Sequence, residues 1–464
     1  MKSSAIFMLA SAAVGQAIQQ CSGTPKEEGG NWFCGAVEQI SYLNVGGPGT
    51  YKAVSQMNED GFCNFEDVAF SGALAPFNEE LVPVFRGPMN LKQVAVYNLS
   101  PKAKRSPAVS HTHAHARRHG QHGHQHLHKK QVEEEPKEKR GEDWVVANID
   151  NQVVSWINNY HGPTPVGPAP VVPTPTPTPT PSQPPVAAAA VPQPGGSKDS
   201  SPKAADSHSG SVNGGYTRVG YYNADNATAD GIVFLGNYGG QGSGKFDNVF
   251  GNSLSYLNAE GTGGAASPQV LKPVTLKSNQ EFLIASDKPC DDDDDLDNSC
   301  GYYRNGSVAY HGFKGFDSVW LFELNMPLDG TTGFNADMSA LWILNARIPR
   351  TAQYSVCSCW PGCGELDILE VLSPGDSKCK STVHSINSGG SSDYFHRPTG
   401  PPVKIAVVLD AESSQVSLKM LDSNVEFGTG ISRSQVESWL SADSVSTAST
   451  DGQSNKVSLF SLSS

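Results

Sequence analysis

The C-terminal half of the chain alternates short apolar runs with turn residues, which is the pattern of an all-β protein. The runs are bounded by Gly, Pro, Asn or Asp, and hardly a helical stripe lies among them. This spacing favours an antiparallel β-sandwich over residues 214–464. Residues 432–440 alone suggest a short helix, with Ser432 as its cap. The runs lie at residues 217–222, 231–236, 281–285, 318–326, 340–345, 366–372, 403–409 and 415–421.

A second group of apolar segments, separated by Gly and Pro, lies near the N-terminus and predicts a small glycine-rich β domain over residues 18–100. Between the two groups, residues 101–213 contain a histidine run and then a Pro-Thr repeat. Proline fixes φ and removes a backbone donor, so this segment is predicted to be a disordered linker.

The histidine run at residues 111–128 has two interpretations. Its eight histidines could hold a metal ion, but a solvated spacer is favoured because no ordered scaffold would fix the ligands. Lys139 and Arg140, just after it, resemble a dibasic processing site.

Residues 1–17 read as a signal peptide, with Lys2, an apolar run and small residues before a cleavage site. The run is too short to span a membrane. The mature protein is therefore expected to be secreted, its nine cysteines are expected to form disulfides, and one is expected to stay unpaired among Cys21, Cys34 and Cys63. Three glycosylation sequons, at Asn98, Asn226 and Asn305, are consistent with export.

The net charge is −13, from 33 Lys and Arg against 46 Asp and Glu. This balance argues against a nucleic-acid partner and is compatible with an uncharged polymer. No cofactor is expected.

Three carboxylates interrupt the apolar run at residues 365–372, namely Glu365, Asp367 and Glu370. Side chains alternate along a strand, so Glu365 and Asp367 share a face and Glu370 would point the other way. A bulge at Ile368 or Leu369 would return Glu370 to the face of the other two.

Carboxylates grouped in this way fit retaining glycoside hydrolysis, which needs a nucleophile and an acid/base. In this hypothesis Glu365 is the nucleophile, Glu370 is the acid/base, and Asp367 keeps Glu370 protonated until it is needed. Trp342 and Trp360, just upstream, offer flat faces on which sugar rings could stack.

Residues 340–345, 359–370 and 381–384 together resemble the laminarinase branch of glycoside hydrolase family sixteen. The resemblance implies a β-jelly-roll fold with the carboxylate strand in its bulged form. It implies the same roles for the three carboxylates, a sugar-binding role for Trp360, and, by a looser match, a site role for His384.

The whole chain is more similar to a fungal cell-surface family, the target-of-SBF wall proteins, which are assigned as glucan endo-1,3-beta-glucosidases. The shared segments are residues 31–35, 85–93, 251–256 and 310–313 together with the carboxylate strand. This resemblance implies a cell-wall location and a β-1,3-glucan substrate.

Several alternatives remain open. A transglycosylase would use the same Glu365 intermediate, and a non-enzymatic wall protein would bind glucan without turnover. The acidic segment between Cys290 and Cys300 could bind calcium, but a solvated loop closed by a local disulfide is favoured. Bridges are likewise favoured over a zinc site for the late cysteines. Among the histidines His311, His384 and His396, only His384 is ranked as a site residue.

Overall fold

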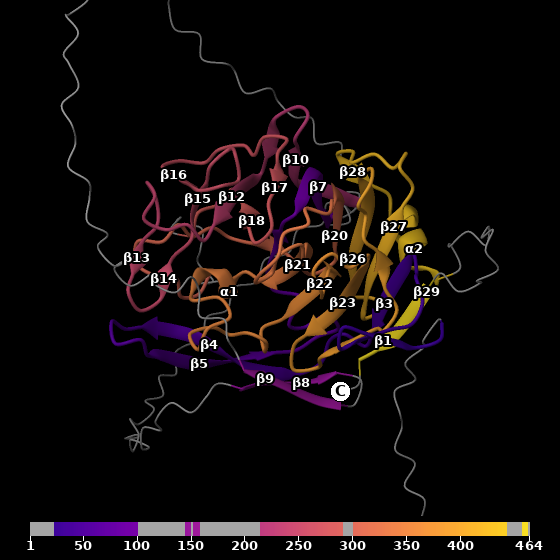
Figure 1. Ribbon diagram of the computed structural model, residues 1–464, viewed down its shortest axis with the longest axis horizontal. Coiled ribbons are helices and arrows are strands. Elements are labelled where there is room, and N and C mark those ends of the chain that lie inside the picture. The colour runs from indigo at the N-terminus through magenta and orange to yellow at the C-terminus, as the bar shows by residue number, and fades with distance from the viewer. Residues whose placement is uncertain are drawn as a thin grey trace, which may run out of the picture.

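Two large β-sheets face each other in the computed structural model, which describes residues 23–100, 144–149, 152–157, 214–290, 300–442 and 457–462 (Figure 1). Almost every ordered element in this part of the chain is a strand, so the predicted all-β sandwich is confirmed. No helix in these ranges is long and apolar enough to cross a membrane. The signal peptide, the histidine run, the dibasic pair and the acidic segment lie outside the described residues.

The sheet that carries the three carboxylates is called the site sheet. It is antiparallel, and β22 lies between β21 and β23, while β6 lies between β18 and β21. Its strands, in spatial order, are β16 (Gly264–Ala265), β15 (Ser255–Leu257), β12 (Ile232–Gly236), β18 (Glu281–Ser286), β6 (Glu80–Arg86), β21 (Ala340–Asn345), β22 (Glu365–Glu370), β23 (Lys378–His384) and β24 (Gly389–Gly390), with β19 (Phe313–Lys314) on β6 and β25 (Phe395–His396) on β23.

The opposite sheet is called the back sheet. It is antiparallel except where β29 runs parallel to β3. Its strands, in order, are β11 (Thr228–Asp230), β10 (Tyr216–Asn223), β7 (Met89–Leu99), β20 (Ser318–Asn325), β26 (Val403–Asp410), β27 (Gln415–Leu421), β3 (Gln39–Leu43) and β29 (Val457–Ser461), with β17 (Thr275–Leu276) on β7 and β28 (Gly430–Ile431) on β10.

Smaller elements surround the sandwich. The predicted helix is present as α2 (Arg433–Leu440), and the Ser432 hydroxyl accepts a hydrogen bond from the Gln435 N–H, as a helix cap does. The other elements are α1 (Arg347–Arg350) and the hairpins β1 (Lys26–Glu28) with β2 (Asn31–Phe33), β4 (Gly49–Met57) with β5 (Cys63–Phe70), β8 (Trp144–Ile149) with β9 (Gln152–Ile157), and β13 (Phe246–Asp247) with β14 (Gly251–Asn252).

The main core lies between the two sheets and is joined across them by aromatic rings. Phe85 of β6 stacks on Phe282 of β18, with ring centroids 5.0 Å apart. Phe85 also meets Phe322 of the back sheet edge-on at 6.0 Å. All three side chains are buried, so truncating any of them would cost about 3–5 kcal/mol of folding free energy.

Both sheets are also covered on their outer faces. Val436 and Trp439 of α2 join the apolar cluster on the outer face of the back sheet, and α2 lies along β27 in Figure 1. Tyr51 of the β4–β5 hairpin joins Trp342 and Leu344 in a cluster on the outer face of the site sheet. The face that holds the carboxylates is therefore partly roofed by a hairpin from the start of the chain.

The prediction of a separate N-terminal domain over residues 18–100 is wrong. Strands β3, β6 and β7 come from this segment, and each lies inside one of the two sheets. Residues 81–85 of β6 are buried on both faces, which only a central strand can achieve. The segment and residues 214–462 therefore build one sandwich.

The segment predicted to link two domains is instead an insertion into a β-hairpin. Strands β7 and β10 pair antiparallel, and Leu99 at the end of β7 lies opposite Tyr216 at the start of β10. The Ser100 N–H donates to the Gly215 carbonyl at 2.9 Å, which extends the ladder by one more pair. The chain therefore leaves the back sheet after residue 100 and returns to it at residue 215, beside the point where it left.

Replacing residues 101–214 with an Asn-Gly turn should preserve the fold. An Asn-Gly pair suits a two-residue hairpin, and a shorter loop costs less entropy to close. We expect a midpoint of thermal unfolding equal to or above that of the full chain, measured by circular dichroism.

The matched control is a chain of residues 214–464 alone. It lacks β3, β6 and β7 and should fail to fold, because two central strands are missing. A cooperative unfolding transition from this fragment would contradict the single-sandwich architecture.

Candidate active site

The predicted bulge is present in β22 between Asp367 and Glu370. Asp367 lies opposite Thr382 of β23, but the next paired residue, Glu370, lies opposite Lys380, so two residues of β22 face one residue of β23. On the other side of β22, the consecutive residues Leu341 and Trp342 of β21 lie opposite Leu369 and Asp367. Ile368 therefore has no partner in β21. Ile368 and Leu369 both enter the main core.

The bulge places all three carboxylates on the outer face of the site sheet. Glu365, Asp367 and Glu370 lie directly opposite three residues of β21 that alternate along that strand, and directly opposite residues share a face. The β21 residues belong to the outer cluster, whereas Leu341 and Ile343 between them belong to the main core; they are Leu344, Trp342 and Ala340.

Asp367 and His384 form an ion pair on this face. The His384 Nε2 atom lies 3.1 Å from the Asp367 Oδ2 atom, and the Asp367 side chain is 7% exposed. Burial opposes a charge on His384, but the hydrogen bond and the charge of Asp367 outweigh it and raise the pKa of His384 to about 9. The pair is therefore an imidazolium and a carboxylate at neutral pH.

Glu365 is held in a buried position with one oxygen left open. The residue is 7% exposed, and it forms a hydrogen bond with the Tyr354 hydroxyl. Its Oε2 atom has no hydrogen-bond partner among the described residues. Leaving a buried oxygen in this state costs about 1–3 kcal/mol.

Glu370 is the more open carboxylate, with 27% of its side chain exposed. The Arg86 Nη2 atom lies 3.8 Å from its Oε1 atom. Burial, followed by the charge of Asp367, raises the pKa of Glu370 to about 7.

Burial and the charge of Asp367 raise the pKa of both glutamates. Burial and the charge of Asp367 raise the pKa of Glu365 to about 8, slightly above that of Glu370. Both stand well above the ordinary range, so the pair retains a proton at neutral pH, and that proton belongs to the pair rather than to one residue.

The two tryptophans behave differently from each other. Trp342 is only 4% exposed, its Nε1 donates to the Tyr354 hydroxyl, and the Arg86 guanidinium lies over its ring at 5.6 Å. The expectation that Trp342 offers a free stacking face is therefore wrong for this conformation. Trp360 is half-buried, and its ring lies 5.9 Å from that of His384, at the Glu365 end of the face.

Sequence reasoning missed Tyr354, Arg86 and Glu281. No pattern in the sequence around Tyr354 predicts its contact with Glu365. Arg86 could have been identified from the sequence, because it places a charge at the end of the apolar strand Glu80–Arg86. Burying a charge is costly unless it is paired, which is the argument that singled out the carboxylates of β22.

The cysteines within the described ranges are disulfide-bonded, with one exception. Cys63–Cys357, Cys290–Cys300 and Cys359–Cys363 form disulfides, and Cys34 is also disulfide-bonded. The free cysteine of the described residues is Cys379, in the core, so the prediction of an unpaired cysteine among the first three is wrong. Cys63–Cys357 ties the β4–β5 hairpin to the loop that carries Tyr354 and Trp360.

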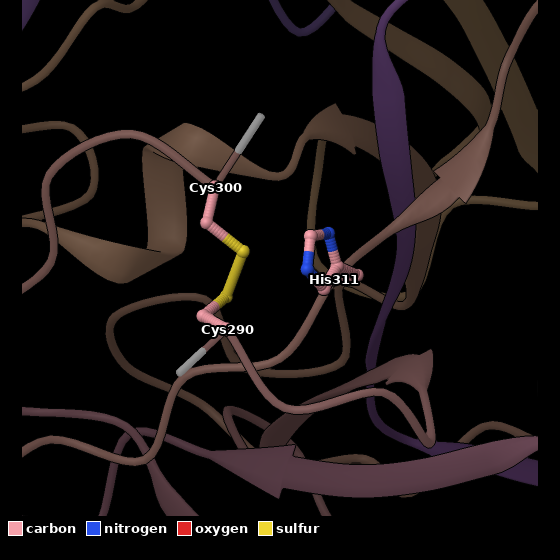
Figure 2. A group of neighbouring side chains, drawn as sticks. All are labelled: Cys290, Cys300 and His311. Carbon is pink, nitrogen blue, oxygen red and sulfur yellow. A yellow bond between two sulfur atoms is a disulfide. The ribbon is translucent and has the colours of Figure 1, made fainter. Parts of the chain in front are cut away.

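In the part of the chain that the structure describes, two groups of side chains have the spacing of metal ligands. Cys290, Cys300 and His311 are one, but Figure 2 shows the two sulfurs joined in a disulfide beside the His311 ring, which removes their capacity as thiolate ligands. Glu365, Asp367 and His384 are the other. The raised pKa of His384 means that a metal ion would have to displace a proton from this imidazole in order to bind.

Comparison with known proteins gives matches along most of the chain. The family described as "Cell wall protein YJL171C/Tos1, C-terminal" matches residues 214–439, and its N-terminal counterpart matches residues 38–99. An Arthroderma benhamiae protein named "Probable circularly permuted 1,3-beta-glucanase" is 40% identical over 85% of this chain and 87% of its own length. Two proteins given the same name with the suffix TOS1, from Candida albicans and Saccharomyces cerevisiae, are each 36% identical over 90% of this chain, and 94% and 93% of their own lengths are covered. No solved structure matches.

The pKa of His384 provides a direct test of the Asp367–His384 pair. We expect the His384 ring to titrate near 9 in the full chain and at a lower pH in Asp367→Asn, because this variant loses the hydrogen bond and the charge that do most to raise the pKa, while burial still lowers it. The ionised pair should stabilise the fold fully below pH about 6.5, and this contribution should decline as the pH rises through about 9. Imidazole NMR across pH measures the titration, with His384→Gln to assign the signal.

The other histidines are the internal control, because they should titrate alike in both proteins. An unchanged His384 titration in Asp367→Asn would show that Asp367 does not hold the imidazolium.

Proposed function

The chain belongs to the YJL171C/Tos1 family of cell wall proteins, and on this basis we propose that it is a secreted β-1,3-glucanase of the cell wall that cleaves glucan with retention of configuration. The observation that carries the proposal is the bulge in β22, which brings Glu365, Asp367 and Glu370 to one face. The names of the relatives support 1,3-glucan as the substrate. The signal sequence and the disulfides support export.

The strand order supports a permuted glucanase. In a circularly permuted sandwich, strands from the start of the chain lie among strands from its end. Strands β6 and β7 lie this way, each between two strands from residues 214–462. Permutation also accounts for the limited reach of the resemblance to family sixteen, which is confined to three segments between residues 340 and 384.

In the first step of the proposed reaction, a Glu365 oxygen bonds to the anomeric carbon as the glycosidic C–O bond breaks. Glu370 gives its proton to the departing oxygen. The open Oε2 atom of the buried Glu365 supports its role as the attacking atom. The greater exposure of Glu370 supports its role at the leaving group, where water must later enter.

In the second step, Glu370 takes a proton from water, the water oxygen bonds to the anomeric carbon, and the bond to Glu365 breaks. Asp367 raises the pKa of both glutamates and so keeps one proton on the pair. Once Glu365 is esterified it carries no charge, so Glu370 can act as a base. The half-buried Trp360 is the proposed platform for a sugar ring.

Neutralising either glutamate should abolish turnover. We expect Glu365→Gln and Glu370→Gln to lower the rate of reducing-end release from linear β-1,3-glucan by about 10²–10⁴-fold. The full chain is used, because β6 comes from the N-terminal segment.

The control is Glu323→Gln. Glu323 lies on β20 of the back sheet, where it accepts a hydrogen bond from Gln93, so its loss should leave the rate unchanged. Glucan binding without turnover in the wild type, unaltered by Glu365→Gln, would instead support a wall-binding protein.

Retention predicts the configuration of the first product. Proton NMR of a freshly started reaction should show the β-anomer first, with the α-anomer growing later by mutarotation. Initial release of the α-anomer would contradict the Glu365 intermediate.

The same reaction separates hydrolysis from transfer. A hydrolase yields only chains shorter than a defined β-1,3-gluco-oligosaccharide. A transglycosylase, which passes the Glu365 intermediate to a sugar hydroxyl, also yields longer ones.

A further inference from the structure

A row of charged side chains continues from Glu370 across the site sheet. Glu370 lies opposite Ala340 of β21, Ala340 lies opposite Arg86 of β6, and Arg86 lies opposite Glu281 of β18. Residues directly opposite in antiparallel strands share a face. Arg86 and Glu281 therefore stand on the carboxylate face, two and three strands from the proposed acid/base.

Arg86 is fixed in place by four contacts. Its Nε donates to the Met338 carbonyl at 2.9 Å, and its guanidinium lies over the Trp342 ring. Its Nη2 atom lies 3.8 Å from Glu370 Oε1, and its Nη1 atom lies 3.7 Å from Glu281 Oε1. The arginine side chain is 13% exposed, so water screens its charge weakly.

The nearly equal distances divide one positive charge between two carboxylates. An arginine paired with Glu370 alone would favour the ionised form, which cannot protonate a leaving group. Glu281 competes for the same guanidinium, so Glu370 lies at ion-pair distance without the close contact of a full Arg–carboxylate bond.

Resting on the proposed function, we infer that Arg86 and Glu281 are positioning residues for Glu370: the guanidinium holds the Glu370 carboxyl on the outer face of the site sheet, and the Glu281 carboxylate offsets enough of the guanidinium's charge for Glu370 to carry a proton. Neither residue needs to touch the reacting atoms. The charged and titratable groups on the same face as Glu370 are Asp367 and Glu365 of β22, His384 and Lys380 of β23, Arg86 of β6 and, beyond it, Glu281 of β18.

The two residues should move the pH profile in opposite directions. Arg86→Met removes the cation, so Glu370 should keep its proton to higher pH. The midpoint of the alkaline limb of the kcat/KM profile should therefore move to higher pH by about one unit. Glu281→Gln removes the carboxylate that competes for the guanidinium, so the midpoint of the alkaline limb should move to lower pH by a smaller amount. The double variant should lie between the two single variants.

A second measurement does not depend on turnover. The ¹³C-carboxyl NMR titration of Glu370, assigned with Glu370→Gln, should shift upward in Arg86→Met and downward in Glu281→Gln. If the wild type degrades no glucan, the proposed function fails while this titration still tests the positioning pair.

Circular dichroism establishes that each variant is folded before it is compared. Equal shifts in both variants, or none in either, would overturn the inference, because a merely structural pair would lower kcat without moving the titration of Glu370 in opposite senses.

Discussion

The site depends on one backbone irregularity, the extra residue in β22 between Asp367 and Glu370. In a regular strand, Glu370 would point into the main core, where an ionised carboxylate costs several kcal/mol. The bulge instead sends Ile368 and Leu369 together into that core and returns Glu370 to the outer face. The apolar residues therefore stabilise the register that the carboxylates need, and packing and chemistry favour the same local geometry.

The outer face is completed by strands far away in sequence. Arg86 arrives on β6, Glu281 arrives on β18, and the roof over Trp342 comes from the β4–β5 hairpin. The Cys63–Cys357 disulfide then ties this hairpin to the loop that holds Tyr354. The N-terminal segment is thus part of the site as well as of the fold, which explains why it cannot be treated as an accessory domain.

The sequence could predict whatever depends on local periodicity. The sandwich, helix α2 and the bulge follow from alternation and from the cost of burying Glu370. The place of β6 could not be predicted, because strand order in a sheet is not a local property. The roles of Arg86 and Tyr354 depend on that order, and the burial of Trp342 depends on a hairpin almost 300 residues away, as the disulfide separation of 294 indicates.

The position of the insertion has a physical consequence for the site. Residues 101–214 enter between β7 and β10 of the back sheet, whereas the carboxylates lie on the outer face of the site sheet, with the main core between them. A hairpin loop can lengthen at little free-energy cost, because closure entropy grows only with the logarithm of length. The length of the insertion can therefore change at this hairpin without altering the register of β22, and the point where the insertion meets the site sheet is the contact of β8 with β24.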